Sequence, residues 1–241
     1  MQRLVKPEFL DDLPPDDPLA VGSRKDLRRL NAWMGNARAM ARVVSSVPRE
    51  QPRLLVELGA GDGNFLYSVA RRLRGRWPGT RAVLVDRLPA VPPETRRKFA
   101  GLGWPVETVT SDVFDWLKRP RATDGELLVA NLFLHHFSGA QLAELFGHAA
   151  RGAHGLVAIE PRRSAWALAF SRLVGLLGCN RVTRHDAPVS VRAGFTGSEL
   201  SQLWPGNGSW SLEERPIGLF SHLFVARRRT LLTPSAQPPT S

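Results

Sequence analysis

Glu57 lies two positions before three glycines in the run 54–65, Leu-Leu-Val-Glu-Leu-Gly-Ala-Gly-Asp-Gly-Asn-Phe. The apolar start of this run is short enough for one buried strand, and apolar residues recur at helical spacing from 65 to 73. Glycine lets the backbone approach a ligand closely, and a helix that follows presents free N–H groups. The pattern therefore predicts a ligand-binding turn that contains Gly59, Gly61 and Gly63.

The spacing of the glycines indicates which ligand suits the turn. A dinucleotide-binding turn has the spacing G-x-G-x-x-G, which would place its third glycine at position 64, where this chain has Asn64. A carboxylate at Glu57 favours a ligand that carries an ammonium group and disfavours a pyrophosphate. The pattern E-x-G-x-G-x-G thus favours a cationic ligand.

Polar side chains also end the next three predicted strands, residues 81–86, 106–110 and 126–131. Asp86 ends the first of them, Asp112 follows the second, and Asn131 ends the third. A doubly wound sheet binds its ligand at the carboxyl ends of its strands, and a carboxylate offers two acceptor oxygens to the hydroxyls of a ribose. These side chains are therefore expected to converge on one ligand.

Together these motifs resemble those of class I S-adenosylmethionine (SAM) methyltransferases. The resemblance covers about residues 50–228. It implies that Glu57 lies near the methionine part of SAM, that Gly59, Gly61 and Gly63 pass beneath the ligand, and that Asp86 binds the ribose. It also implies that Asp112 accepts the adenine amino group, that the backbone N–H of Val113 meets a ring nitrogen, and that Asn131 borders the cofactor.

A histidine pair follows the fourth predicted strand in the run Asn-Leu-Phe-Leu-His-His-Phe, residues 131–137. The run is similar to the corresponding segment of small-molecule methyltransferases of the quinone-biosynthesis and phenol-methylating type. A hydroxyl or activated carbon loses a proton as it attacks a methyl group, and histidine is suited to accept one near neutral pH. We expect His135 or His136 to be this base, with packing beneath the pocket as the alternative role. No obvious cluster of acids follows Asn131, so a metal-free site is expected.

The predicted fold is an α/β, Rossmann-like class I methyltransferase fold. Further strands are expected at 155–161, 211–217 and 221–227, which gives a seven-stranded, mostly parallel sheet with an antiparallel last strand. Residues 1–50 form an N-terminal arm and capping helix, and residues 51–228 form the SAM-dependent domain. Residues 229–241 are rich in Pro, Ser and Thr and are expected to be disordered.

The N-terminal region predicts an extended arm over 1–22, followed by one amphipathic helix that Ser23 caps and Pro48 ends. Related methyltransferases close an N-terminal helix over the cofactor. We therefore expect residues 33–36, which include Trp33 and Asn36, to line the cofactor or acceptor pocket.

Residues 162–192 form an insertion after the fifth predicted strand. Its apolar segment, 166–178, is too short to span a bilayer, and it suits either a lid over an apolar acceptor or a helix resting on a membrane surface. Residues 181–192 show no clear helix or strand pattern, and a polar loop is expected there. His185 and Asp186 are a second acid–base candidate within that loop, or simply surface groups.

The composition limits the classes of partner. The net charge is +11, but almost all the positive charge is arginine, scattered along the chain and not interleaved with aromatic residues, which disfavours a nucleic-acid substrate. The single cysteine, Cys179, excludes a disulfide framework and a cysteine metal cluster. Nothing indicates export, so a cytoplasmic location is expected. The sequence carries no signal for an oligomeric state and leaves peripheral membrane contact open.

The sequence as a whole predicts a SAM-dependent methyltransferase. Its expected acceptor is a small apolar molecule, the hydroxyl of a phenolic or polyketide-type metabolite of secondary metabolism. The expected reaction is in-line displacement with a histidine as base. The rivals are a carbon-methylating quinone-type enzyme, an RNA or protein methyltransferase, and a non-catalytic SAM-fold binding protein.

Overall fold

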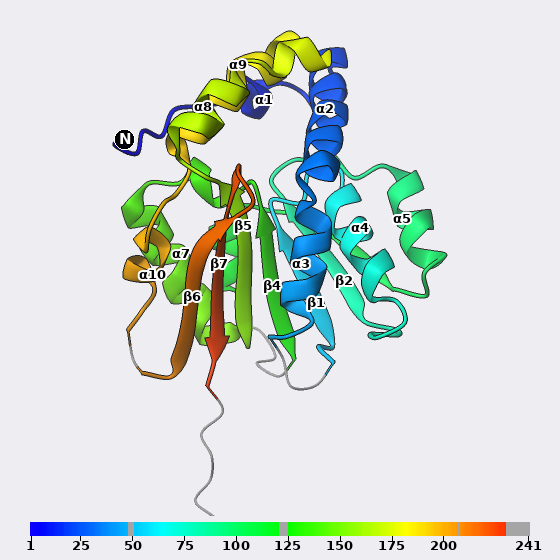
Figure 1. The fold of residues 1–241 in the computed structure, drawn as a ribbon. Coiled ribbons are helices and arrows are strands. Elements are labelled where there is room, and N and C mark those ends of the chain that lie inside the picture. The colour runs from blue at the N-terminus through cyan, green and yellow to red at the C-terminus, as the bar shows by residue number, and fades with distance from the viewer. Residues whose placement is uncertain (48–50, 121–124, 207, 230–241) are drawn as a thin grey trace, which may run out of the picture.

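A computed structural model describes residues 1–47, 51–120, 125–206 and 208–229 of the chain. Seven strands form one sheet in the order β3-β2-β1-β4-β5-β7-β6 (Figure 1). The strands are β1 (Leu54–Leu58), β2 (Arg81–Asp86), β3 (Val106–Thr110), β4 (Glu126–Asn131), β5 (Gly155–Pro161), β6 (Trp210–Ile217) and β7 (Ser221–Arg228). The first five are parallel, and β7 runs antiparallel between β5 and β6. The predicted fold class is confirmed.

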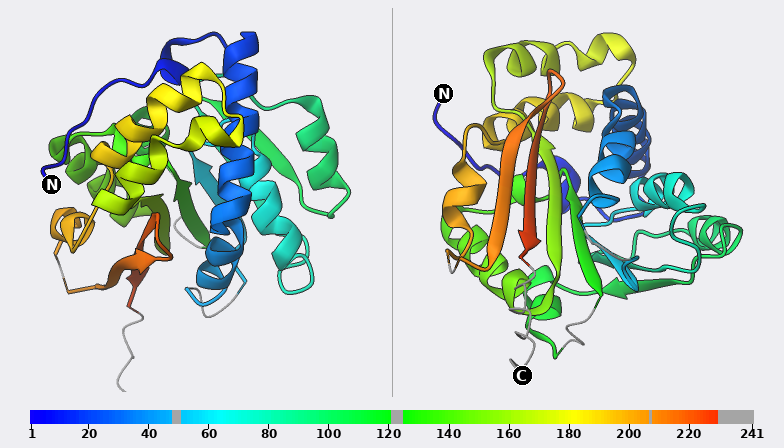
Figure 2. Two further views of the ribbon diagram at one scale, coloured as in Figure 1. Left: turned by 45° about the horizontal axis from the view of Figure 1, so that its top comes forward. Right: turned by 60° about the horizontal axis from the view of Figure 1, so that its bottom comes forward.

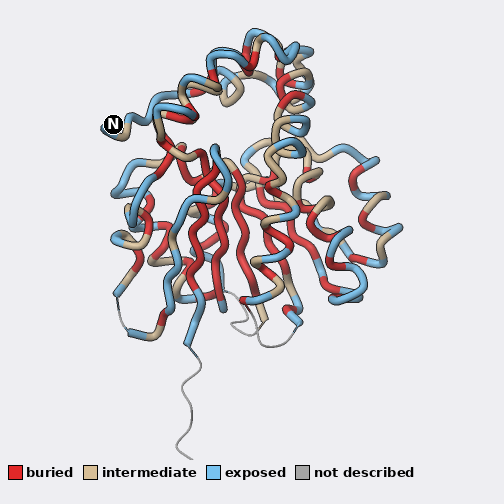
Figure 3. Tube along the Cα trace, in the orientation of Figure 1, coloured by how far each residue is buried: buried red, intermediate tan, exposed pale blue. Residues whose placement is uncertain are grey.

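Helices cover both faces of this sheet. One face carries α3 (Asn36–Val44), α4 (Asn64–Leu73) and α5 (Pro93–Ala100), and the other carries α6 (Val113–Lys118), α7 (Gly139–Gly152) and α10 (Glu199–Leu203) (Figure 2). Each layer buries its own hydrophobic cluster against the strands. Every residue of β4 and β5 is buried, as their near-continuous apolar runs predict for central parallel strands (Figure 3).

A helical cap lies over the carboxyl ends of the strands (Figure 1). It consists of α1 (Phe9–Asp12), α2 (Pro18–Met34), α8 (Ala165–Ser171), the short 3₁₀ helix η2 (Val174–Leu177) and α9 (Arg181–Ala193). A second 3₁₀ turn, η1 (Leu134–His136), carries the histidine pair directly beneath. The N-terminal arm and the insertion after β5 therefore build one cap together.

The prediction of a single N-terminal helix is wrong, because α2 and α3 are two separate helices. α2 begins at Pro18, and the side chain of Asp17 caps it by accepting from the backbone N–H of Leu19 at 2.7 Å. Ser23 is not the cap, because it lies inside α2, where its hydroxyl bonds to that of Thr183 at 2.9 Å. Gly35 adopts φ +72°, which ends α2 and starts α3 in a new direction. Pro48 and the predicted disordered tail lie outside the described residues, except residue 229.

The prediction of a polar loop at 181–192 is also wrong, because these residues belong to α9. Asn180 caps this helix by accepting from the backbone N–H of Thr183 at 2.9 Å. Pro188 lies inside the helix and obscures its pattern in the sequence. Packing against α1, α2 and α8 stabilises the helix despite its polar composition.

Substituting Gly35 tests the break between α2 and α3. We expect Gly35→Ala to lower the free energy of unfolding by about 1–2 kcal/mol, because a Cβ strains a left-handed residue even though nothing lies within 4 Å of it. Urea denaturation measures this difference. Gly139→Ala is the matched control, since its Cβ also meets nothing and its φ is not positive. Equal stability of the two variants would contradict the proposed role of Gly35.

Candidate active site

One cavity of about 760 Å³ lies beneath the cap, at the carboxyl ends of β1, β2 and β4. It brings together residues that are far apart in the sequence. The predicted site residues that line it are Glu57, Gly59, Gly61, Asp86, Asp112, Val113, Asn131, His135 and His136. Of the three predicted glycines, Gly63 is not part of the lining.

Glu57 is buried at the end of β1 and borders the cavity. Burial raises the pKa of its carboxyl well above the ordinary value, and the negative charges of Asp62 and Asp86 add to the shift. Its Oε2 atom is buried and has no hydrogen-bond partner among the described residues. A cationic group in the cavity would provide that partner and favour the ionised carboxylate.

Asp86 and Asp112 are held by backbone N–H groups. Asp86 accepts from Gly61 at 2.7 Å and from Leu88 at 2.9 Å, which fixes the glycine turn against the end of β2. Asp112 accepts from the backbone N–H of Phe114 at 2.7 Å and caps α6. A carboxylate has about four acceptor positions, so both side chains keep free positions toward the cavity.

The three glycines have different roles. All three adopt positive φ angles, of 69° at Gly59, 52° at Gly61 and 71° at Gly63. A Cβ on Gly59 would lie 2.1 Å from the ring of Phe133, and one on Gly63 would lie 2.7 Å from Leu84. A Cβ on Gly61 would meet no protein atom within 4 Å, so Gly61 presents bare backbone to the cavity. Gly63 instead allows α4 to begin close to β2.

Asn131 belongs to a buried amide network beneath the cap. Its side chain donates to Asn31 of α2 at 3.2 Å and accepts from Asn36 of α3 at 3.2 Å. Asn36 in turn accepts from the hydroxyl of Ser221 at 2.9 Å. The network ties β4 and β7 to the two N-terminal helices at the edge of the cavity.

His135 is enclosed between two carboxylates. Its Nδ1 lies 2.8 Å from Glu160 of β5, and its Nε2 lies 3.2 Å from Glu8 of the N-terminal arm. Burial by itself lowers the pKa of His135, but the hydrogen bonds and negative charges of both carboxylates outweigh it and raise the pKa to about 9. His135 is therefore an imidazolium at neutral pH, and both of its nitrogens are occupied.

His136 has a different environment. Its side chain is 24% exposed, and its Nδ1 lies 3.1 Å from Asp11 of α1. Burial raises the pKa of Asp11, but the hydrogen bond and charge of His136, with Arg87, bring it below the ordinary value. An ionised Asp11 can only accept, so Nδ1 of His136 donates to it, and Nε2 is the ring nitrogen that Asp11 does not occupy.

Four residues of this site were missed in the sequence analysis: Glu8, Asp11, Glu160 and Ser190. Glu160 had a signal, because it lies near the end of β5 as Asp86 does for β2. Glu8, Asp11 and Ser190 had none, since only the tertiary structure brings the arm and α9 to η1. Ser190 donates a short hydrogen bond to Glu8.

Glu8, His135 and His136 present ligand-type atoms within 4.8 Å of one another. In this structure Glu160, Asp11 and Ser190 hydrogen-bond to them, and Glu8 bonds directly to His135. The cluster is thus a hydrogen-bonded ion-pair network.

Two other predicted groups lie elsewhere. Trp33 and Asn36 do not line the cavity, whereas their neighbours Asn31 and Ala32 do. Trp33 is 59% exposed and stacks on Phe170 of α8, so the expected role of residues 33–36 in the lining is wrong.

His185 and Asp186 do not line the cavity either. Asp186 accepts from the backbone N–H groups of Phe9 and Leu10 at 2.9 and 3.0 Å, and the ring of His185 stacks on Phe9. The pair therefore anchors α1 to α9.

The apolar segment of the insertion is not part of the cavity wall. Of residues 162–192, all of which are described, Ser190 lines the cavity and the segment 166–178 contributes nothing to the lining. Within the described parts of the chain, no helix has both the length and the apolar character needed to cross a membrane.

No protein-family model and no curated protein matches the sequence. Solved structures do match. An O-methyltransferase family protein from Burkholderia thailandensis aligns with a TM-score of 0.58 and 20% identity, over 90% of this chain and 63% of that protein. The chain has the α/β methyltransferase fold. The methyltransferase domain of bacterial CtHen1-C aligns with a TM-score of 0.55 and 12% identity over 82% of this chain and 98% of that one. A SAM-dependent methyltransferase from Aquifex aeolicus aligns with a TM-score of 0.51 and 14% identity over 77% and 87%.

The enclosed imidazolium predicts a pH dependence of stability. The folded pKa of about 9 lies above the unfolded value near 6.5, so this stabilisation is complete below pH 6.5 and is lost as pH rises through 9. At 1.36 kcal/mol per pKa unit, the loss is on the order of 3 kcal/mol. Denaturation in urea at pH 6.5 and 9.5 measures it. His135→Gln should remove this dependence of the free energy of unfolding on pH, and His148→Gln should leave it unchanged. A His135→Gln variant with the wild-type pH dependence would refute the assignment of the effect to His135.

Proposed function

We propose that this chain is a SAM-dependent methyltransferase that methylates a hydroxyl of a small apolar acceptor, of the phenolic or polyketide type. The observation that carries the proposal is that the strand-end carboxylates, the glycine turn and His136 all line the same cavity. This arrangement supports the proposal because methyl transfer to a hydroxyl requires a cofactor and a base next to each other.

The residues present fit SAM. Glu57 offers a buried, unpartnered oxygen to an ammonium group, and Gly61 leaves its face of the turn open. Asp86 and Asp112 keep acceptor positions for ribose hydroxyls and the adenine amino group. When bound, SAM would supply an electrophilic methyl group on a sulfonium.

His136 is the residue that would accept the proton. With its Nδ1 donating to Asp11, its Nε2 takes the proton of the acceptor hydroxyl while that oxygen forms its bond to the methyl carbon and the bond from carbon to sulfur breaks. Asp11 holds the ring in the tautomer that this step needs and stabilises the imidazolium that results. His135 does not take this role, because it is already protonated and enclosed by Glu8 and Glu160.

Apolar side chains line the cavity beside His136. Phe133 and Phe137 pack edge to face at 5.1 Å between their centroids and line it beside His136. Val5 and Leu10 of the N-terminal arm face the same space. Such walls suit an aromatic or aliphatic acceptor and exclude water from the proton transfer.

Transfer of labelled methyl from SAM tests the proposal. We expect label to enter the pool of organic-extractable phenolic compounds, and His136→Gln to lower turnover by roughly 10²–10⁴ with the affinity for SAM unchanged. His148→Gln, a histidine on α7 outside the cavity lining, should keep wild-type turnover. EDTA should have no effect, since the proposed step uses no metal.

Label found in other pools would support one of the alternative functions. Label in RNA or protein would overturn the acceptor class, and label on carbon would leave the cofactor site intact but change the product. A His136→Gln variant with wild-type turnover would exclude His136 as the base. Binding of SAM without transfer to any pool would favour a non-catalytic protein.

The cofactor assignment has a separate test. We expect Asp86→Ala to weaken SAM binding at least tenfold by calorimetry, because it removes the ribose acceptor and loosens the turn at Gly61. Asp115→Asn is the control, since Asp115 is an exposed acid on α6 that does not line the cavity. Equal affinity of both variants would count against SAM at this position.

A further inference from the structure

The segment 166–178 exposes a large apolar surface on the outside of the cap. Half of the large hydrophobic side chains exposed by the described residues lie at the C-terminal end of α2, along α8, η2 and the link between them, and on the turn between β6 and β7. We call them the apolar face: Trp33, Trp166, Leu173, Leu176, Leu177 and Leu219. Trp166 and Leu176 are 82% and 83% exposed, which a monomeric soluble surface seldom allows for neighbouring residues of this size.

This face is one surface assembled from separate elements. Trp33 of α2 stacks on Phe170 of α8 with centroids 5.1 Å apart, and Phe170 contacts Phe220 of the β6–β7 turn at 4.7 Å. The backbone N–H of Leu173 donates to Phe170 at 2.8 Å, and that of Leu176 donates to Leu173 at 2.9 Å. These contacts hold the C-terminal end of α2, α8, η2 and the β6–β7 turn together on one side of the cap.

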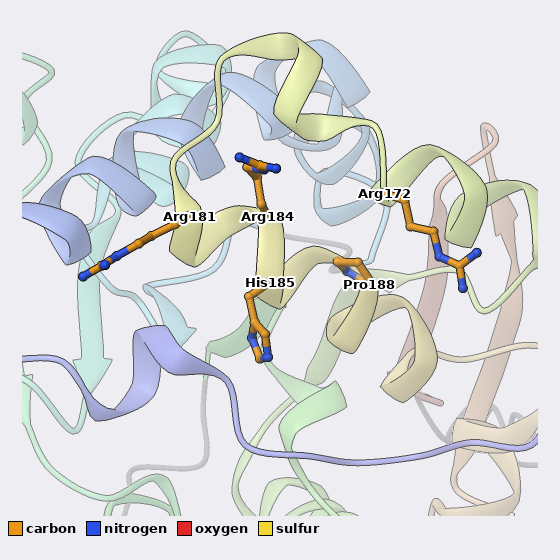
Figure 4. Close-up of a pocket in the computed structure, with 5 residues that line it drawn as sticks. All are labelled: Arg172, Arg181, Arg184, His185 and Pro188. Atoms are coloured by element: carbon orange, nitrogen blue, oxygen red, sulfur yellow. The ribbon is translucent and has the colours of Figure 1, made fainter.

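Arginines border the apolar face. Arg172, Arg181 and Arg184 are all exposed. Arg172 directly follows α8, Arg181 and Arg184 belong to α9, and Figure 4 shows the three side chains pointing in different directions. They do not converge as they would around one bound anion. The acids on α2 and α9, Asp26 and Asp186, are both buried, so the exposed charges of these two helices are positive. The exposed acids of the cap, Asp12 and Asp16, lie on α1 and just before α2.

We propose that this surface docks the protein on an anionic lipid membrane. Exposed Trp and Leu side chains beside separated arginines match an interface in which apolar groups enter the acyl boundary and arginines meet many lipid headgroups. A second copy of the chain fits less well, because a twofold interface would bring the same arginines against one another. The inference rests on the exposed surface and not on the proposed reaction.

Docking there would orient the molecule. The cap covers the carboxyl ends of the strands, so the cavity lies at the end of the molecule that meets the membrane (Figure 1). If the proposed function holds, an apolar acceptor dissolved in the bilayer would reach the cavity without crossing open water.

Flotation with vesicles tests the proposal on the full chain. We expect the protein to float with vesicles of equal phosphatidylglycerol and phosphatidylcholine and not with pure phosphatidylcholine. Neutralising three arginines as Arg172→Gln, Arg181→Gln and Arg184→Gln should lower partitioning roughly 100-fold. Trp166→Ser with Leu176→Ser should lower it at least roughly tenfold, and 0.5 M NaCl should weaken wild-type binding.

Matched control variants distinguish binding through this surface from a nonspecific effect of net charge or of exposed apolar area. Arg42→Gln, Arg74→Gln and Arg76→Gln remove the same charge at the other end of the sheet, where α3 and α4 end (Figure 1). Leu4→Ser with Leu212→Ser removes exposed apolar groups elsewhere. Both control proteins should float as the wild type does.

Three results would overturn the proposal. They are a wild type that does not float with anionic vesicles, control variants that lose binding as strongly as the test variants, and a Trp166→Ser, Leu176→Ser protein that changes only its oligomeric state. Because SAM binding and methyl transfer to a water-soluble acceptor are measured separately, failure of docking and failure of the proposed function are distinguishable.

Discussion

The enclosure of His135 between Glu160 and Glu8 is the interaction on which the site depends. A buried imidazolium is costly unless both of its N–H groups meet acceptors, and here two carboxylates meet them. Glu160 belongs to β5 and Glu8 to the N-terminal arm, while Ser190 of α9 holds Glu8 in turn. The ion pair therefore joins the sheet, the arm and the insertion, and it fixes η1 in the position that points His136 into the cavity.

The same constraint separates the roles of two adjacent histidines. The oxygens of Glu160 also accept from the backbone N–H groups of Phe133, Leu134 and His135, at 2.9–3.3 Å, so the carboxylate is surrounded by donors. Both ring nitrogens of His135 are occupied by the carboxylates that hold this turn. His136, one residue further, meets a single carboxylate at the edge of the cavity and keeps one nitrogen available. Two adjacent histidines thus differ in how many of their ring nitrogens are occupied, because their burial and the number of nearby acceptors differ.

The cap shows how a polar site and an apolar exterior are combined. Its inner side carries Glu8, Asp11 and Asn31 toward the cavity, and its outer side carries Trp33, Trp166 and Leu176 toward solvent. The insertion after β5 stabilises the arm through Asp186 and His185 and does not wall the cavity with its apolar segment. An apolar segment in a methyltransferase-like chain therefore does not have to belong to the acceptor pocket.

The sequence by itself determined the sheet and the part of the cavity that the strand ends form. Apolar runs bounded by glycine or polar residues fixed all seven strands, and the parallel order then placed Glu57, Asp86, Asp112 and Asn131 at one edge. These residues lie in the last two positions of their strands or, for Asp112, two positions after one, so local pattern was enough to locate them. The break at Gly35, the helix around Pro188 and the partners of the histidines were decided by the tertiary structure. Glu8 lies 127 residues from His135, and no local pattern encodes a contact that forms only when the arm, β5 and α9 pack together.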